Sequence, residues 1–248
     1  MSVVDDVRSG KARAEWADVV SQGEDGTALR ITVMRDALKV DGVRVPVNAR
    51  EMQEIADLLG CLLLTTKVVD LIYQQAALRF EPVVRADGFI VALSSAKRVS
   101  GLIDLVIKHH GGDPGGLIDS IGKYWVLHNH LSDVNELRHG KATVCNYGWL
   151  GESAYYPAET KGLKCWQTPG FQHDDNHVDP SQLVRLMKRK AVLLRPCQPD
   201  EDVDLLELLQ NPDLASLANH AGVLTYLRVA TAPEPEASEL IELLPYDA

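Results

Sequence analysis

The sequence predicts an α+β fold: a single domain with a mixed or antiparallel central sheet and helices on one side. Alternation of apolar and polar residues from 29 to 45 indicates antiparallel strands, and helical spacing of apolar residues between 48 and 107 indicates three helices. Beyond residue 122, runs rich in β-branched and aromatic residues indicate further strands. With 248 residues, 46% of them hydrophobic, the chain can bury one full core.

We expect three regions along the chain: an N-terminal extension over 1–28, one α/β domain over 29–230 and an acidic C-terminal tail over 231–248. The extension mixes charged and small residues around Trp16 and is predicted to hold one short amphipathic helix before Gly23. The tail alternates proline and glutamate before a short apolar segment at 240–244.

The firmest local prediction is a hairpin within residues 38–45. Apolar and polar residues alternate there as they do in residues 29–33, and Asp41-Gly42 stands in the middle of the run. Asp-Gly is typical of the type I′ turn, because both turn residues must adopt a positive φ.

Each of the three predicted helices begins at a polar residue that can cap its first turn. The candidate caps are Asn48, Thr65 or Thr66, and Ser94 or Ser95. Asn48 is followed three residues later by Glu51, as in a capping box, and the helix is expected to run to Gly60. The second is expected to end before Pro82, and the third to continue to residue 107. We expect these helices to cover one side of the sheet.

The rest of the chain is predicted to add mostly strands. Residues 111–116 are glycine-rich but match neither GxxxxGKS/T nor GxGxxG, so a plain loop is favoured over a phosphate-binding loop. Strands are expected over 123–128 and 141–147 and within 183–194. Helical segments are expected at 202–209 and, after Pro212, at 213–220.

Composition excludes several classes of partner. The net charge of -10 makes nucleic acid an unlikely ligand, because phosphate backbones are repelled. The longest apolar run, at 58–64, is far short of the roughly 18 to 20 residues that a membrane helix needs. Acidic residues stand near the start, where a secretory signal would be basic, so a cytoplasmic location is expected. The four cysteines have no CxxC spacing and are expected to be reduced thiols.

The candidate chemistry lies in the histidine-rich stretch from 128 to 182. His128 and His130 are two apart in a predicted strand and should share a face, and His177 and Asp179 are also two apart, with His173 just upstream. If the two groups converge, His128, His130 and His177 are candidate ligands of a divalent metal such as zinc. Alternatively, His173 or His177 is a general base oriented by Asp179. Surface or structural histidines are the third interpretation.

Two nucleophiles and a group of aromatic residues belong to the same stretch. Ser181 could complete a Ser-His-Asp set, although no GxSxG elbow is present. Cys145 is either a nucleophile or, more simply, a buried thiol. The aromatic side chains suit a binding cleft for a sugar, peptide or ring, or else a packed core. The candidate substrate-binding residues are Trp125, Tyr147, Trp149 and Trp166.

These segments resemble a group of bacterial and phage proteins for which no activity is established. In that group a YGWH segment is followed by a histidine and a DYSQ or DYSH segment that leads into RLV; the matching residues here are 146–149 and 173–186. The resemblance extends over roughly residues 40–225 and implies a fold more than a reaction. Leu150 stands where the group has its histidine, and Pro180 where it has tyrosine.

A second, fainter resemblance is to the closing HG…SHGCIRL segment of L,D-transpeptidases, which act on cell-wall peptides. His173, Ser181, Arg185 and Leu186 carry it. The nucleophilic cysteine of that family is absent, because Leu183 and Val184 fill the region. The resemblance therefore does not imply transpeptidase activity.

Taken together, these observations predict a hydrolase with a His/Asp site, with or without a divalent metal, acting on an amide or glycan such as cell-wall material. A cell-wall enzyme without a secretory signal would need lysis or an injection machine for its release. The alternative is a non-catalytic protein, either a phage-related or virion-associated component or a carbohydrate-binding module.

Overall fold

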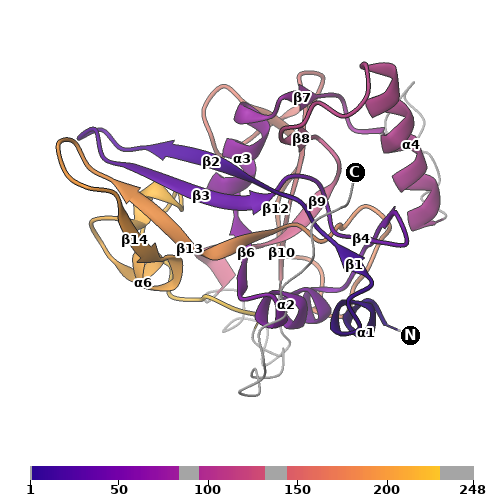
Figure 1. Ribbon diagram of the computed structural model, residues 1–248, viewed down its shortest axis with the longest axis horizontal. Coiled ribbons are helices and arrows are strands. Elements are labelled where there is room, and N and C mark those ends of the chain that lie inside the picture. The colour runs from indigo at the N-terminus through magenta and orange to yellow at the C-terminus, as the bar shows by residue number, and fades with distance from the viewer. Residues whose placement is uncertain (1, 84–94, 132–143, 230–248) are drawn as a thin grey trace.

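The computed structural model describes residues 2–83, 95–131 and 144–229, and its centre is a nine-stranded sheet (Figure 1). The strand order is β11-β12-β10-β9-β6-β13-β3-β2, and β14 pairs with β13. All pairs are antiparallel except β6 with β9. The strands are β2 (Trp16–Gln22), β3 (Ala28–Met34), β6 (Cys61–Thr65), β9 (Lys123–Leu127), β10 (Cys145–Leu150), β11 (Tyr156–Pro157), β12 (Lys164–Gly170), β13 (Leu186–Leu194) and β14 (Glu201–Asp204). The predicted α+β class, mixed sheet and single domain are confirmed.

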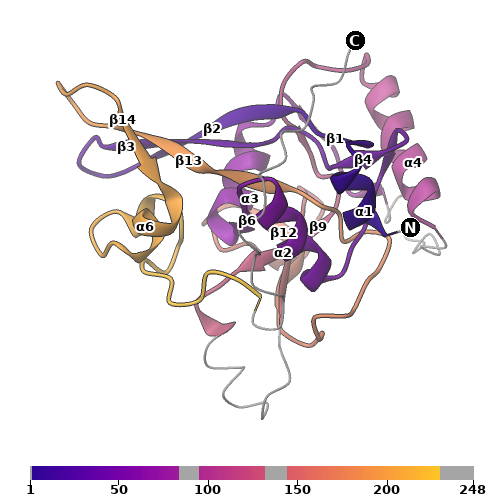
Figure 2. The same ribbon diagram turned by 60° about the horizontal axis from the view of Figure 1, so that its bottom comes forward.

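The long strand β13 joins the two halves of the sheet. Its first residues pair with β6, and the rest of it pairs with β3 on one side and β14 on the other. The hairpins β2–β3 and β13–β14 extend together as an arm away from the helices α2 (Ala49–Leu58) and α4 (Ala96–His109) (Figure 1). The short helix α6 (Leu205–Gln210) packs against β13 and β14 beneath this arm (Figure 2).

The predicted helix starts are confirmed. Asn48 and Glu51 form a capping box at α2, in which each side chain accepts from the other's backbone amide. Thr65 caps α3 (Thr66–Gln75) by accepting from the amide of Val68, and Ser95 caps α4. In the segment predicted as one helix from 202, residues up to Asp204 belong to β14 instead, and α6 starts after them.

The expectation that these helices lie on one side of the sheet is wrong for α2 and α3. Trp125 of β9 lies opposite Asn146 of β10, so Tyr147, the next residue, points to the other face. The Trp125 indole donates to the carbonyl of Val47 just before α2, whereas the Tyr147 hydroxyl contacts Asp70 of α3. The two helices therefore cover opposite faces. The physical reason is β6, whose five residues are all buried, so both of its faces need a cover.

Residues 1–28 were expected as an extension, but residues 2–28, the part that the structure describes, belong to the domain. They form α1 (Val3–Arg8), β1 (Ala12–Arg13) and β2, and β2 pairs with β3 along its whole length. The short helix was predicted, but the residues around Trp16 form a strand. Val4, Val7 and Val19 are buried in the common core, which explains why this segment folds onto the sheet.

Two smaller sheets complete the described fold. One contains β1, β4 (Lys39–Val40) and β5 (Val43–Arg44). Asp41 and Gly42 connect β4 to β5 with φ of 49° and 75°, which confirms the predicted hairpin. The other pairs β7 (Leu78–Arg79) with β8 (Ile118–Asp119) in parallel. The predicted strand residues 141–143 and the apolar tail segment 240–244 lie outside the described residues.

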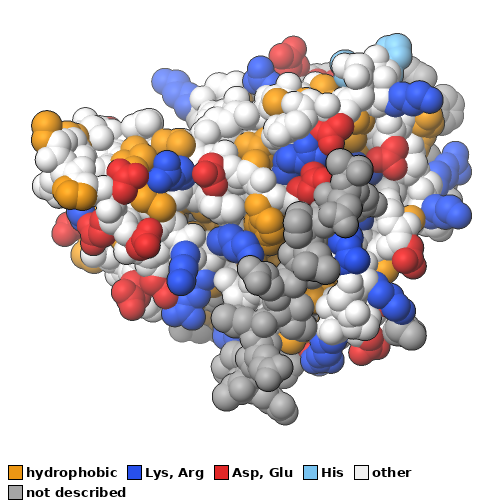
Figure 3. Space-filling model, viewed as in Figure 1, with side chains coloured by type: hydrophobic (Ala, Val, Ile, Leu, Met, Phe, Trp, Pro, Cys, Tyr) orange, Lys and Arg blue, Asp and Glu red, His pale blue; other side chains and the backbone are white. Residues whose placement is uncertain are grey.

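The visible surface mixes acidic and basic side chains without a large field of one sign (Figure 3). Across the described ranges, no helix combines the length and the apolar character that crossing a bilayer requires.

The core also contains a fully buried arginine. Arg185 donates to Asp119 Oδ1 (2.8 Å) and to the carbonyls of Met34 (2.9 Å) and Arg35 (2.8 Å). It thereby ties the segment before β13 to the end of β3 and to β8. Because the charge is both paired and hydrogen-bonded, its burial is tolerated.

Arg185→Ala is expected to lower the free energy of unfolding by about 3–5 kcal/mol, because it leaves the buried Asp119 carboxylate without its counter-ion. Urea unfolding followed by circular dichroism measures the loss. The matched control is Arg189→Ala in β13. The Arg189 side chain is 49% exposed, so water can replace it as the partner of Asp204, and the loss should be under about 1 kcal/mol. Equal losses in the two variants would contradict the conclusion that the buried pair of Arg185 and Asp119 stabilises the core.

Candidate functional site

The structure brings His173, His177 and Asp179 together, as the sequence predicted. The rings of His173 and His177 stack with centroids 3.7 Å apart and an angle of 9° between their planes. Both rings contact Trp125 edge-on, at 6.2 and 6.4 Å. His177 Nε2 lies 3.9 Å from Asp179 Oδ2, which is beyond hydrogen-bonding distance.

Asp179 is instead occupied by Lys123 and Ser181. Lys123 Nζ is 2.6 Å from Asp179 Oδ2, while Oδ1 accepts from both the amide (2.8 Å) and the hydroxyl of Ser181. Burial alone would raise the pKa of Asp179, but the hydrogen bonds from Lys123 and Ser181 and the charge of Lys123 hold it below its ordinary value. This carboxylate therefore neutralises a lysine and does not orient a histidine.

Close backbone packing delivers Lys123 to this position. The Lys123 amide donates to the Ser181 carbonyl (3.0 Å), and the Leu183 amide donates to the Lys123 carbonyl (3.1 Å). A Cβ on Gly122 would lie 2.7 Å from the Ser181 carbonyl oxygen, so only glycine permits this approach. The contact spans more than fifty residues of sequence and was not predicted.

Ser181 is not placed as a nucleophile. It is 1% exposed, and its hydroxyl donates to Asp179 and not to an imidazole. A serine nucleophile needs a base that accepts its proton, and here the base would be a carboxylate already paired with Lys123. The geometry thus does not support the Ser-His-Asp expectation. Cys145 is 1% exposed, and burial raises its pKa well above the ordinary range, as suits an inert core thiol.

The predicted metal ligands are not gathered. His128 and His130 do stack, with centroids 5.2 Å apart, but both ring nitrogens of His128 are engaged: Nε2 with Glu159 (3.1 Å) and Nδ1 with the His130 amide (3.2 Å). Glu159 lies beside Tyr147, whereas His177 lies against Trp125 on the other face of the sheet. Over the residues with described positions, no three His, Cys, Asp or Glu side chains form a group that could hold a metal ion.

The four predicted substrate-binding aromatics do not line a common cleft. Trp125 and Tyr147 are buried core residues on opposite faces. Trp149 is half-buried with Lys123 Nζ 5.5 Å above its ring, and Trp166 is half-buried in edge contact with the exposed Tyr155. The prediction grouped these residues because they are close in the sequence. In the structure, neighbouring side chains along a strand point to opposite faces, so the four residues are separated.

A second constellation, not predicted from the sequence, is centred on the fully buried Asp70 of α3. Its Oδ1 accepts from the Tyr147 hydroxyl (2.6 Å), and its Oδ2 accepts from the Thr160 amide (2.9 Å) and from His220 Nε2 (3.0 Å). His220 Nε2 is also 3.2 Å from Thr160 Oγ1. Three donors from three segments therefore compensate one buried carboxylate.

His220 connects this buried carboxylate to a polar pocket. Its side chain is 26% exposed, and within the described part of the chain Nδ1 has no hydrogen-bond partner. The pocket has a volume of about 490 Å³. Its described lining residues are Gln22, Gly23, Glu24, Asp25, Thr27, Lys67, Asp213, Leu214, Ser216, Leu217 and His220. A carboxylate on one ring nitrogen, with the other nitrogen left for a ligand, is the arrangement of a general base.

Lys67 is the one lysine or arginine among the described residues of this pocket. Its Nζ donates to the carbonyl of Ser216, and burial lowers its pKa. Glu24, Asp25 and Asp213 supply carboxylates, of which Asp25 accepts from the amide and hydroxyl of Thr27. The pocket therefore combines a base, a cation and acidic groups in one hollow.

Only one signal in the sequence could have indicated this site. Thr66, Val69, Asp70 and Tyr73 follow helical spacing and are all buried, so a carboxylate stands on the apolar face of a helix. Such a residue needs a partner. The sequence does not show that the partner is His220, which is 150 positions away.

Comparison of the chain with protein-family models, with curated proteins and with solved structures finds no match.

Lys123→Met is expected to raise the pKa of Asp179, because it removes the nearest positive charge and a hydrogen-bond donor. A ¹³C NMR titration of the aspartate carboxyl groups measures it. In the folded wild type the pKa of Asp179 is lower than its ordinary value. Ionised Asp179 therefore stabilises the protein at pH values above the ordinary pKa, and this stabilisation is lost as the pH falls through the folded pKa. In the variant, the stabilisation should be lost at a higher pH than in the wild type. Lys161→Met, on an exposed lysine, is the control; an unchanged Asp179 titration would refute the pairing.

Proposed function

We propose that this protein is a hydrolase in which His220, held by Asp70, is the general base. The observation that carries the proposal is the 3.0 Å hydrogen bond between the buried Asp70 carboxylate and a histidine that lines a pocket of about 490 Å³. The class is the one expected from the sequence, a His/Asp hydrolase, but the residues differ. The expected cytoplasmic location, and release by lysis or injection for a cell-wall substrate, remain part of this proposal.

The mechanism uses the described side chains alone. His220 Nδ1 takes a proton from water as the water oxygen attacks the carbonyl carbon, and Asp70 stabilises the resulting imidazolium. The Lys67 ammonium is the group available to stabilise the oxyanion. The imidazolium then returns its proton to the leaving amine as the carbon–nitrogen bond breaks, so protons and electrons balance.

An amide fits this arrangement better than a glycan does. A histidine base with a nearby cation suits attack on a carbonyl, whereas glycoside hydrolysis generally relies on two carboxyl groups across the scissile bond. The proposed substrate class is therefore an amide, such as the peptide amides of cell-wall material. Tyr147 and Thr160 support the reaction indirectly, because they hold the Asp70 carboxylate in place.

His220→Gln should lower kcat/KM by about 10²–10⁴-fold, since it removes the base. The assay measures amine release from purified peptidoglycan and from a panel of fluorogenic peptide amides with the full chain. Asp70→Asn should also reduce kcat, because an amide cannot stabilise the imidazolium as a carboxylate does.

The matched control is His173→Gln, another partly exposed histidine, which should retain wild-type activity and thermal stability. If His173→Gln lost activity and His220→Gln retained it, the active site would be the cluster of His173, His177 and Asp179 and not the pocket of His220. No hydrolysis of any tested amide by the wild type, with the fold intact, would count against the proposal.

A non-catalytic carbohydrate-binding role is the second candidate, and one observation favours it. Tyr156 of the edge strand β11 is 54% exposed, and Tyr155, the residue before this strand, is 78% exposed and contacts Trp166 at 4.6 Å. Exposed aromatic rings at a sheet edge can stack on sugar rings.

Under this alternative, the double variant Tyr155→Ala and Tyr156→Ala should weaken binding to an insoluble glycan by about tenfold, because two stacking surfaces are lost. Co-sedimentation with purified peptidoglycan or chitin measures it. Val178→Ala, at another exposed apolar residue, should bind as the wild type does. Equal sedimentation of the double variant and the wild type would exclude this surface.

A further inference from the structure

The segment that carries His220 is short and irregular. Residues 211–223, all of which the structure describes, belong to no strand, and their regular part is the 3₁₀ helix η2 (Ala215–Leu217). The backbone bonds here are local, such as the one from the amide of Asn219 to the carbonyl of Ala215 (2.9 Å). The position of His220 relative to Asp70 therefore depends on side chains that reach this segment from other elements.

The hydroxyl of Thr65 contacts the segments of both members of the Asp70–His220 pair. Thr65 is fully buried where β6 ends and α3 begins. Its oxygen accepts from the amide of Val68 (3.2 Å) and so caps the helix that carries Asp70. Its proton is donated to the carbonyl of Ala218, two residues before His220. A hydroxyl has one proton to donate, so this bond uses the whole donor capacity of the side chain.

Two asparagines attach the segment on the other side of His220. Asn219 is 2% exposed, and its Nδ2 donates to Asn129 Oδ1 (2.7 Å) and to the carbonyl of Gly222 (2.7 Å). Asn129, which follows β9, donates from its own Nδ2 to the carbonyl of Val223 (2.6 Å). His220 therefore lies between two attachments to the body of the protein.

These attachments matter because the Asp70 carboxylate is fixed and cannot follow a moving imidazole. Asp70 is fully buried, and Tyr147 and Thr160 hold it with bonds of 2.6 and 2.9 Å. Ala218 is also fully buried, so its carbonyl needs a donor and the segment would shift without one. A displacement of about 1 Å in a catalytic arrangement can lower the rate on the order of 10²-fold.

We propose that Thr65 is a positioning residue whose hydroxyl sets the distance between Asp70 and His220. The inference rests on the proposed function, because it concerns the same pair of residues. One hydroxyl fastens the segment of each partner: it caps the helix of Asp70 and bonds the loop of His220. Thr65 therefore acts through the backbone of these segments and not on the substrate.

Thr65→Val tests the proposal, because it keeps the shape of the side chain and removes the hydroxyl. ¹⁵N-edited NMR of the histidine rings reports the proton on His220 Nε2, and the signal is identified by its absence in His220→Gln. We expect this hydrogen-bonded signal in the wild type and in Thr65→Ser, and its loss in Thr65→Val. In the peptide-amide assay, Thr65→Val should lower kcat about tenfold with KM changed less than about twofold, whereas Thr65→Ser should keep about half of kcat or more.

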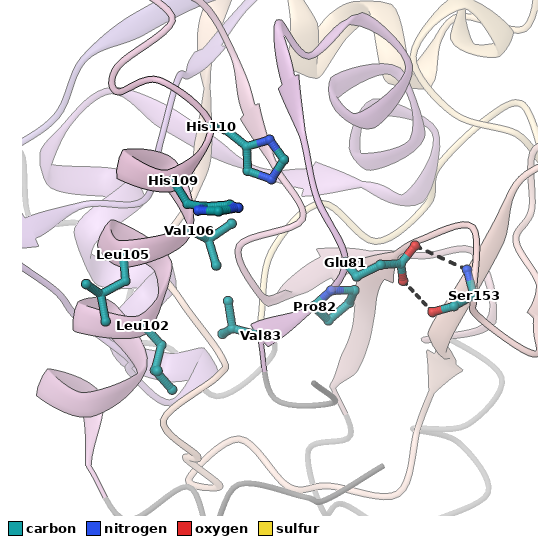
Figure 4. A pocket seen from close by; sticks show the side chains of 9 residues that line it. All are labelled: Glu81, Pro82, Val83, Leu102, Leu105, Val106, His109, His110 and Ser153. Carbon is teal, nitrogen blue, oxygen red and sulfur yellow. Dashed lines mark hydrogen bonds between the residues drawn. The ribbon is translucent and has the colours of Figure 1, made fainter. Parts of the chain in front are cut away.

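Helix α4 supplies the matched control, because its cap can be removed at a distance from His220. Ser95 caps it by accepting from the amide of Arg98 (3.3 Å). This helix borders a separate hollow of about 480 Å³, and the described lining residues, drawn in Figure 4, include none of those that hold Asp70 or His220. Ser95→Ala should lower Tm through the loss of a cap, yet keep both the His220 signal and kcat.

Retention of the Nε2 signal, or of wild-type kcat, in Thr65→Val would overturn the proposal. Loss of the signal in Ser95→Ala would also overturn it, since the effect would then follow from any lost cap. If Thr65→Val does not fold, Thr65→Ala carries the same expectation, and failure of both variants to fold would make Thr65 a requirement of the fold instead. Absence of amide hydrolysis by the wild type would refute the hydrolase, whereas the NMR signal still decides whether Thr65 positions His220.

Discussion

The buried carboxylate of Asp70 is the interaction on which the rest of the structure depends. A charge inside a protein is tolerated only where donors surround it, and here they come from β10, from the loop after β11 and from the chain beyond α6. These segments are 77, 90 and 150 positions from Asp70. Asp70 therefore fastens α3 to the sheet and, with the same bonds, orients His220 at its pocket.

The sheet separates two sets of histidines that lie in one stretch of the sequence. Trp125 and Tyr147 face opposite ways, so His173 and His177 gather on one side with Trp125, while Glu159 holds His128 near Tyr147 on the other. This arrangement explains why a shared metal site was a reasonable expectation and why the geometry does not produce it. Ligands that flank one strand in sequence can be divided by its two faces.

The cluster of His173, His177 and Asp179 shows where local reasoning succeeds and where it stops. Their proximity was predictable, because residues within one short loop cannot be far apart. The role of Asp179 was not, because Lys123 reaches it through the close approach of Gly122 to the Ser181 carbonyl. Whether a carboxylate orients an imidazole or neutralises a lysine depends on which partner the tertiary fold brings nearer.

The sequence alone determined features that depend on neighbours in the chain: the caps at Asn48 and Thr65, the Asp41-Gly42 turn and the α+β class. The caps and the turn arise from bonds or dihedral angles within a few residues, and the fold class follows from the periodicity of apolar residues along each segment. The tertiary structure decided which face each helix covers, the pairing of β2 with β3 and the partnership of Asp70 with His220. Such contacts join distant segments, and an apolar or charged residue shows that a partner is needed without showing which one it is.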